Sequence, residues 1–320
     1  MRKTLLLAAA LIGARAINAQ PVAKLKVTIL TTMVSDLKGM GEWGFSALVE
    51  TDSTRIIFDV GAHPNTMLDN AAELQVDLAG IRQVVLSHNH GDHTAGLQNL
   101  RKRFPDQKTA STVYIGQGFF IREVGGLKKA TDSLAFRSSG GNFVVVDKPV
   151  KIGPGLFLTG PVPRKYPTEK NFPLGRTLTP VTAFSTAAIT IPAGATVEDN
   201  VPEDMSMVIE TPKGLVILMG CGHAGIINTL EYVQQQFAGK QIFAIVGGAH
   251  LIDTKDDQLD WTAGKLKAAG IRYFVGAHCT GLNSVYRIRE ITGLPKTDCL
   301  VAAVGNTFTL DKGITTGWLR

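Results

Sequence analysis

The feature that most constrains the fold is a cluster of three histidines and an aspartate directly after an apolar run. Residues 84–86 read Val-Val-Leu, and residues 87–93 read Ser-His-Asn-His-Gly-Asp-His. The apolar run predicts a buried strand, and the cluster at its end would deliver several ligand atoms to one point. Neutral imidazole with carboxylate suits zinc and its first-row neighbours. A metal site is therefore expected at this strand end; the alternative is a polar loop whose histidines make ordinary hydrogen bonds.

The spacing within this loop separates its ligands into two pairs. His88 and His90 alternate by two, so an extended backbone puts both on the same side. Asp92 and His93 fall in the turn that follows and face the same metal-binding cavity from another side. Two pairs on one loop predict two metal ions.

Three later histidines also follow apolar runs that predict strands, and these are His223, His250 and His278. Open α/β layers gather their ligand-binding loops at the carboxyl ends of strands. One loop cannot surround two ions, so these residues are candidates to complete the coordination. Each one taken singly is more often a structural histidine, but their shared placement favours ligands.

Residues 88–93 have the pattern His-x-His-x-Asp-His, which resembles the signature of the metallo-β-lactamase superfamily. The chain past residue 25 is similar to one branch of it, the archaeal dihydropterin ribofuranosylaminobenzene phosphate synthases. Gly222 departs from that branch, which usually has serine there. In chain order, the motifs that carry the resemblance are Glu-x-Gly at 42–44, Asp-x-Gly at 59–61, Asn-Ala at 70–71, Asp204, Gly-Cys-x-His-Ala-Gly-Ile at 220–226, Gly-Gly-x-His-Leu at 247–251 and His-Cys-Thr-Gly at 278–281.

The resemblance implies an α/β fold, the four-layer αββα sandwich built from two related halves. The sequence agrees, because residues 46–61 and 206–220 each read as a hairpin that leads into a loop and then a helix. Between the halves, residues 101–200 are rich in Gly, Pro, Ser and Thr and have poor periodicity, apart from short strands near 113–115 and 143–146. We interpret them as a substrate-shaping insertion within one domain, 20–320.

With this fold, we expect two divalent metal ions. Zinc is the first choice, and manganese and iron are also compatible with the ligands. A water between them would become the nucleophile for an acyl or phosphoryl centre. Asp92 would orient this water and later carry a proton, and Asp59 would accept a hydrogen bond from a ligand imidazole. His250 either lines the pocket, ligates in place of His223, or simply packs. The expected ligand sets are His88, His90 and His223 for one ion, and Asp92, His93 and His278 for the other.

Two of the three cysteines flank proposed ligands. Cys221 and Cys279 stand beside His223 and His278 and do not have the spacing of a disulfide scaffold. Cys221 occupies the place where many superfamily members have a bridging carboxylate, so it is either a thiolate ligand or a buried inert thiol. Cys299 carries no functional signal.

The amino terminus has the pattern of a secretory signal. Arg2 and Lys3 precede an apolar stretch at 5–12, and Ile-Asn-Ala at 17–19 offers a cleavage site. We therefore predict a signal peptide at 1–19 and an exported protein, periplasmic or secreted. The apolar stretch is too short for a stable membrane anchor.

Charge gives little indication of a macromolecular partner. Removing residues 1–19, which carry three basic and no acidic residues, lowers the formal net charge from +6 to +3, and this does not demand a nucleic-acid partner. Arg164, Lys165, Lys170 and Arg176 form either a solvated basic loop or a collar that attracts an anionic or phosphorylated small molecule. The branch that the chain resembles often has an arginine directly after a proline such as Pro163, which favours a substrate-binding role for Arg164. The oligomeric state leaves no trace in the sequence.

Three functions compete at this point. The first is an exported metal-dependent hydrolase that uses a metal-activated water on an ester, lactone or phosphoester. The second, implied by the resemblance, is a transferase that condenses a pterin with an aminobenzene ribonucleotide; its substrates belong to a cytoplasmic pool, so the export signal argues against it. The third is a non-catalytic metal-binding protein, disfavoured because three protein ligands per ion leave open positions, which is typical of catalytic sites.

Overall fold

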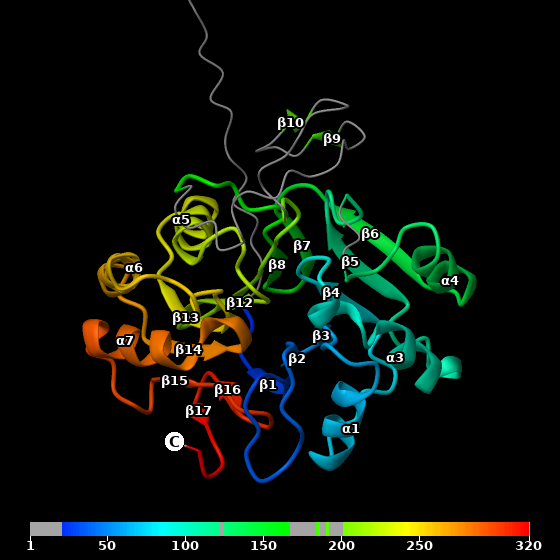
Figure 1. The fold of residues 1–320 in the computed structure, drawn as a ribbon, viewed down its shortest axis with the longest axis horizontal. Coiled ribbons are helices and arrows are strands. Elements are labelled where there is room, and N and C mark those ends of the chain that lie inside the picture. The colour runs from blue at the N-terminus through cyan, green and yellow to red at the C-terminus, as the bar shows by residue number, and fades with distance from the viewer. Residues whose placement is uncertain (1–20, 122–124, 167–183, 186–189, 192–200, 320) are drawn as a thin grey trace, which may run out of the picture.

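The computed structural model describes residues 21–121, 125–166, 184–185, 190–191 and 201–319. Two mixed β-sheets face each other in the middle of the molecule, and helices cover the outer face of each (Figure 1). The predicted signal peptide lies outside the described residues. No helix in the described part of the chain is long and apolar enough to cross a membrane.

The first sheet contains eight strands within the described residues, in the order β17-β16-β1-β2-β3-β4-β5-β6. Strands β3 to β6 run parallel to one another, whereas the other pairs are antiparallel. The strands are β1 (Leu25–Thr31), β2 (Ser46–Thr51), β3 (Arg55–Phe58), β4 (Gln83–Leu86), β5 (Thr112–Gly116), β6 (Asn142–Val146), β16 (Thr307–Thr309) and β17 (Gly313–Thr315).

The second sheet has the order β15-β14-β13-β12-β11-β8-β7, and its strands β12 to β15 are parallel. A separate pair joins β9 (Phe184–Ser185) and β10 (Thr190–Ile191). The strands of the second sheet are β7 (Val150–Gly153), β8 (Leu156–Leu158), β11 (Met207–Thr211), β12 (Gly214–Met219), β13 (Ile242–Gly248), β14 (Tyr273–Ala277) and β15 (Cys299–Val301).

Helices pack on the two outer faces (Figure 1). The first sheet carries helices from the first half of the chain, and the second sheet carries helices from the second half. Short 3-10 turns occur at Pro105–Gln107 and His278–Thr280. The helices are α1 (Thr66–Glu73), α2 (Gly91–Thr94), α3 (Leu97–Arg103), α4 (Asp132–Ser138), α5 (Ile226–Gln236), α6 (Asp256–Ala268) and α7 (Leu282–Thr292).

Three apolar cores hold the layers together. Alternate residues of the strands, such as Phe58 and Val216, meet between the two sheets. Their neighbours Ile57 and Ile217 face outward, into one core beneath α1, α3 and α4 and another beneath α5, α6 and α7. Both faces of these strands are buried, which is why the sequence there reads as continuous apolar runs. The four-layer αββα prediction is confirmed, and both predicted hairpins form, as β2–β3 and β11–β12.

The predicted insertion begins with strands of the sandwich itself. Strands β5 and β6 join the first sheet, and β7 and β8 join the second, so residues 112–158 connect the two sheets. The predicted short strands near 113–115 and 143–146 form, as β5 and β6. Strand β7 was not predicted, because it is an edge strand with no buried residue and its apolar pattern is interrupted. Most of the predicted insertion beyond residue 166 lies outside the described residues.

Candidate metal centre

Four histidine rings, three from the loop after β4 and one from the loop after β12, gather around one point with their planes tilted against one another. The ring of His88, just past β4, lies 4.6 Å from His90, 4.3 Å from His93 and 4.6 Å from His223, measured between centroids. His223 follows β12 in the opposite sheet. The carboxyl ends of parallel strands in both sheets therefore converge where the sequence predicts ligands.

The two remaining predicted histidines join this cluster through different rings. His278, after β14, lies 4.9 Å from His93, and His250, after β13, lies 4.5 Å from His223. Six of the seven histidines of the chain thus form one network of ring contacts. The seventh, His63, is largely exposed and contacts Glu42 at 2.9 Å.

The structure brings together all six predicted ligands in the two predicted groups. Within each group, one ligand atom from each residue lies within 4.8 Å of the others. Asp92 is the most exposed carboxylate of the centre, with 21% of its side chain accessible, so the second group opens toward solvent. The groups are His88, His90 and His223, and Asp92, His93 and His278.

Asp59 fixes the proton positions of two of these imidazoles. Its Oδ2 accepts a hydrogen bond from His93 Nδ1 at 2.7 Å and another from the Ser87 hydroxyl at 2.8 Å. Because the Ser87 hydroxyl gives its proton to Asp59, it accepts one from His88 Nδ1, 2.9 Å away. Both imidazoles then carry the proton on Nδ1, which leaves Nε2 as the ligand atom. Asp59 thus accepts a hydrogen bond from a candidate ligand imidazole, His93, as the sequence analysis predicts, and it orients a second one, His88, through the Ser87 hydroxyl.

The donor set fits a metal ion. His88 Nε2 is fully buried and has no hydrogen-bond partner among the described residues. A buried nitrogen without a partner is costly, and a cation at that position removes the cost. Burial, reinforced by the neighbouring imidazoles, also holds the pKa values of His88 and His223 well below the usual range. Both rings are therefore neutral bases at physiological pH, the form that binds metals.

Two buried carboxylates that precede β11 hold the ligand loops in place. Glu203 Oε1 accepts a hydrogen bond from the backbone N–H of Asn89 at 3.0 Å, between the two first histidines. Asp204 Oδ2 accepts one from the backbone N–H of Ala224 at 2.8 Å, next to His223. The sequence analysis missed the role of Glu203, although an adjacent Glu-Asp pair before an apolar strand is a signal that could have revealed it.

Close packing of the two sheets at the centre requires glycine at position 220. A Cβ there would lie 2.0 Å from the Ser87 hydroxyl and 2.4 Å from Asp59 Oδ2. These are the atoms that orient His88 and His93, so any side chain at position 220 would displace them.

His93 and Asp92 form a charged pair in the metal-free protein. Burial opposes protonation of His93, but the carboxylates of Asp59 and Asp92 outweigh it and raise the pKa of His93 to about 9. Burial likewise opposes ionisation of Asp92, yet the imidazoles of His93 and His278 hold its pKa well below the usual range. His93 therefore carries a proton at pH 7, and a metal must displace it.

Apparent metal affinity is expected to rise about tenfold per pH unit between pH 7 and 9, and to level off above pH 9. The reason is that the folded-state pKa of His93, about 9, lies above its ordinary value of 6.5. Because the pKa of His93 is raised on folding, its ion pair stabilises the metal-free fold. This stabilisation is fully present below pH 6.5 and is lost as pH rises through about 9. Titration calorimetry in two buffers with different ionisation enthalpies measures the released proton. Affinity that is constant across this range would contradict the assignment.

The other predicted site residues lie at the margins of the centre. Cys221 Sγ is 3.2 Å from His93 Nε2, and Cys221 also groups with His223 and His250 as a set that could hold an ion. Arg164 is half-buried, and its guanidinium donates hydrogen bonds to the backbone carbonyls of Val162 and Val201.

The rest of the predicted basic collar does not gather at the centre. Lys165 pairs with Glu231 on α5 at 2.5 Å, and Lys170 and Arg176 lie outside the described residues.

One further residue at the mouth of the centre was not predicted. The ring of Trp43 is half exposed and lies 5.0 Å from the ring of His278. An exposed tryptophan beside a buried ligand offers an apolar contact to a bound molecule. Its position next to the Glu-x-Gly motif was visible in the sequence, but its exposure was not.

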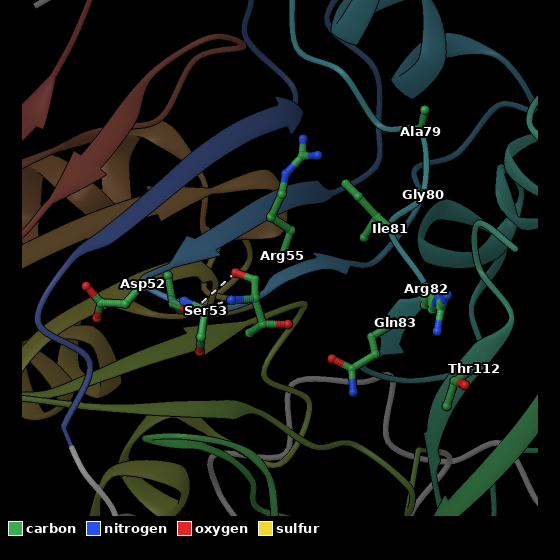
Figure 2. Close-up of a pocket in the computed structure, with 11 residues that line it drawn as sticks. Asp52, Ser53, Arg55, Ala79, Gly80, Ile81, Arg82, Gln83 and Thr112 are labelled. Atoms are coloured by element: carbon green, nitrogen blue, oxygen red, sulfur yellow. Dashed lines mark hydrogen bonds between the residues drawn. The ribbon is translucent and has the colours of Figure 1, made fainter. Parts of the chain in front are cut away.

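The pocket in Figure 2 lies at the opposite end of the strands from the metal centre. It has a volume of about 650 Å³ and is lined by residues 51–55, 79–83 and Thr112, at the β2–β3 turn and the amino ends of β4 and β5. The side chains of Arg55 and Arg82 do not converge within it (Figure 2). Since ligands of such sheets bind at the carboxyl ends of strands, the histidine cluster is the stronger candidate.

Known proteins share sequence with much of this chain. Residues 44–166 match the model of the metallo-beta-lactamase superfamily. The chain is 28% identical over 254 residues to a 7,8-dihydropterin-6-methyl-4-(beta-D-ribofuranosyl)-aminobenzene-5'-phosphate synthase from Methanocaldococcus jannaschii, which covers 75% of this chain and 82% of that protein. The resemblance stated from the motifs is thereby confirmed.

Solved structures share the fold. Tm1679, described as a metal-dependent hydrolase of the beta-lactamase superfamily, has a TM-score of 0.68 and 24% identity, covering 89% of this chain and 98% of its own. Zn²⁺-bound PqqB from Methylobacterium extorquens has a TM-score of 0.50 and 16% identity, covering 88% and 99%. These structures confirm the metallo-β-lactamase sandwich as the fold of this chain.

Proposed function

We propose that this chain, which has the metallo-β-lactamase fold, is an exported metal-dependent hydrolase of an ester, lactone or phosphoester. The observation that carries the proposal is the pair of adjoining ligand groups, each with three protein ligands. Three ligands leave a coordination position for water or substrate, as catalytic sites require. Export rests on the charge and apolar pattern of residues 1–19.

The proposed cofactor is a pair of divalent ions, with zinc as the first choice and manganese or iron as alternatives. His88, His90 and His223 would hold one ion, and Asp92, His93 and His278 the other. When bound, such ions lower the pKa of a water molecule to about 7 and stabilise negative charge that develops on the substrate.

The protein groups around this pair have distinct tasks in the proposed reaction. Asp59 keeps the Nε2 atoms of His88 and His93 directed at the centre, through the hydrogen bonds described above. Asp92 is the most exposed of the candidate ligands in its group, so it is the group best placed to orient the attacking water and to receive a proton.

The substrate we propose is a small, anionic molecule with an apolar part. Arg164 places a positive charge near His223, where it contributes to the lowered pKa of that imidazole, behind burial and the neighbouring histidines. Trp43 offers an apolar surface on the other side, beside His278. A substrate lying between them would present its charged end to Arg164 and its apolar end to Trp43.

A transferase is the second candidate, and its support is the 28% identity to the archaeal synthase. The motifs that contain the candidate metal ligands are among those on which the sequence analysis based the resemblance to that branch. The two candidates therefore differ in the acceptor, water in one case and an aromatic amine or pterin in the other.

Hydrolysis of chromogenic esters, lactones and phosphodiesters is expected from the metal-loaded protein and is expected to stop on chelation. Activity should return when zinc, manganese or iron is added back, because the ions supply the nucleophile. The assay compares an anionic and a neutral ester with the same leaving group. A chelator-treated protein that remains fully active would exclude the proposal, and transfer to an added amine without hydrolysis would favour the second candidate.

A further inference from the structure

Two buried thiols contact each other at the edge of the metal centre, where Cys221 Sγ lies 3.2 Å from His93 Nε2. Cys221, after β12, and Cys279, after β14, have their Sγ atoms 3.2 Å apart, and both are at most 2% exposed. This separation is well beyond the ~2.05 Å of a disulfide bond. It is nearer the roughly 3.8 Å that separates two sulfurs at about 2.3 Å from one tetrahedral zinc ion.

An imidazole completes this pair. The ligand atoms of Cys221, Cys279 and His278 all lie within 4.8 Å of one another. His278 is 1% exposed, and its Nδ1 has no hydrogen-bond partner among the residues that the structure describes. The same histidine also belongs to the group with Asp92 and His93.

We propose that Cys221, Cys279 and His278, here called the thiol set, form a second ligand set that takes one soft divalent ion such as Zn²⁺ or Cd²⁺. This inference rests on the proposed function, because the thiol set shares His278 with the catalytic pair. An ion in the thiol set and an ion held by Asp92, His93 and His278 compete for one imidazole.

The chemistry of the thiol set favours this assignment. On binding, both thiols lose their protons to solvent, and the two thiolates balance the charge of a divalent ion. Two backbone features already hold the ligands close, because Cys279 Sγ contacts the Cys221 carbonyl at 3.6 Å and the Thr32 hydroxyl accepts a hydrogen bond from the His278 N–H at 2.9 Å.

Metal preference follows from the ligand types. Sulfur ligands select soft ions, whereas the carboxylate and imidazoles of Asp92, His93 and His278 also accept manganese. We therefore expect zinc and cadmium to enter the thiol set, and manganese to remain with Asp92. The identity of the second metal would decide which ligand set His278 serves.

The test uses the full chain, stripped of metal and reloaded with Co²⁺, whose bonds to thiolate give an intense near-ultraviolet absorption band. The wild-type protein should show this band, and Cys279→Ser should lose roughly half of it, because one of two thiolates remains. Cys299→Ser is the matched control: Cys299 is equally buried, but its Sγ contacts the Val285 carbonyl at 3.7 Å, outside the thiol set. The control should keep the full band.

The outcomes separate this inference from the proposed function. A wild-type protein that loads Co²⁺ without the band would overturn the thiol set and leave the nitrogen and oxygen ligands as the metal centre. A wild-type protein that binds no metal would overturn both. The ¹¹³Cd magnetic resonance spectrum of the Cd²⁺-loaded wild-type protein needs no variant: a resonance shifted downfield into the range of sulfur ligation supports the thiol set, and resonances only in the range of nitrogen and oxygen ligation overturn it.

Discussion

Metal content and turnover are expected to fall together when His88 is replaced by alanine. His88 is at the middle of the ring network, in contact with His90, His93 and His223, and its Nε2 is directed at the centre. Its loss removes one of three ligands from the first group, so we expect less than one equivalent of metal at that group. Turnover should fall on the order of 10²–10³-fold or more, the range for loss of a group that stabilises transition-state charge. Elemental analysis and steady-state kinetics on the same sample measure both quantities.

The matched control is His63→Ala. His63 is 69% exposed and pairs with Glu42, away from the cluster, so its replacement should leave both metal content and turnover unchanged. A His88→Ala protein with full metal loading and unaltered turnover would remove His88 from the site. Equal losses in the two variants would indicate a general effect on folding.

Replacing Asp59 by alanine is expected to cost about 3–5 kcal/mol of the free energy of unfolding. Asp59 is fully buried and accepts hydrogen bonds from the Ser87 N–H, the Ser87 hydroxyl and His93 Nδ1. Its removal leaves these donors without their acceptor and releases the proton positions of His88 and His93. Metal affinity should also fall by about 10–100-fold, as when the hydrogen-bond acceptor of a ligand imidazole is lost.

Chemical denaturation of the metal-free protein and a metal competition assay measure these two effects separately. Asp69→Ala is the control, because Asp69 is exposed on α1 and should change the free energy of unfolding by no more than about 0.5 kcal/mol. If Asp59→Ala unfolds like the control and binds metal as tightly as wild type, Asp59 does not orient the ligands. Asp59→Asn, which keeps the volume, should still lose metal affinity because its amide can present N–H groups to the same donors.

Much of the fold was predictable from particular segments. The hairpins at 46–61 and 206–220 are continuous apolar runs because both faces of their strands are buried, and their shared plan predicted two related halves. The strands after β5 gave a weaker signal: β6 was predicted as an isolated short strand, whereas exposure interrupts the apolar pattern of the edge strand β7. The segment containing them was therefore interpreted as an insertion, although it joins both sheets.

Part of the candidate site could also be predicted from the sequence, and part could not. Histidines at strand ends were visible because residue type and position together indicate a ligand, and the structure gathers all six. The contact between Cys221 and Cys279 could not be predicted, because it depends on how closely the loops after β12 and β14 approach. The same holds for Trp43, whose exposure beside His278 depends on the path of the loop that follows β1.

Anomalous diffraction at the absorption edge of the bound metal tests the central claim most directly. For crystals of the zinc-loaded protein, the account predicts one peak bonded to His88, His90 and His223. It predicts a second bonded to His278, with either Asp92 and His93 or Cys221 and Cys279 as the other ligands. Protein that carries no metal after purification and reloading, or peaks bonded to residues outside this cluster, would contradict it.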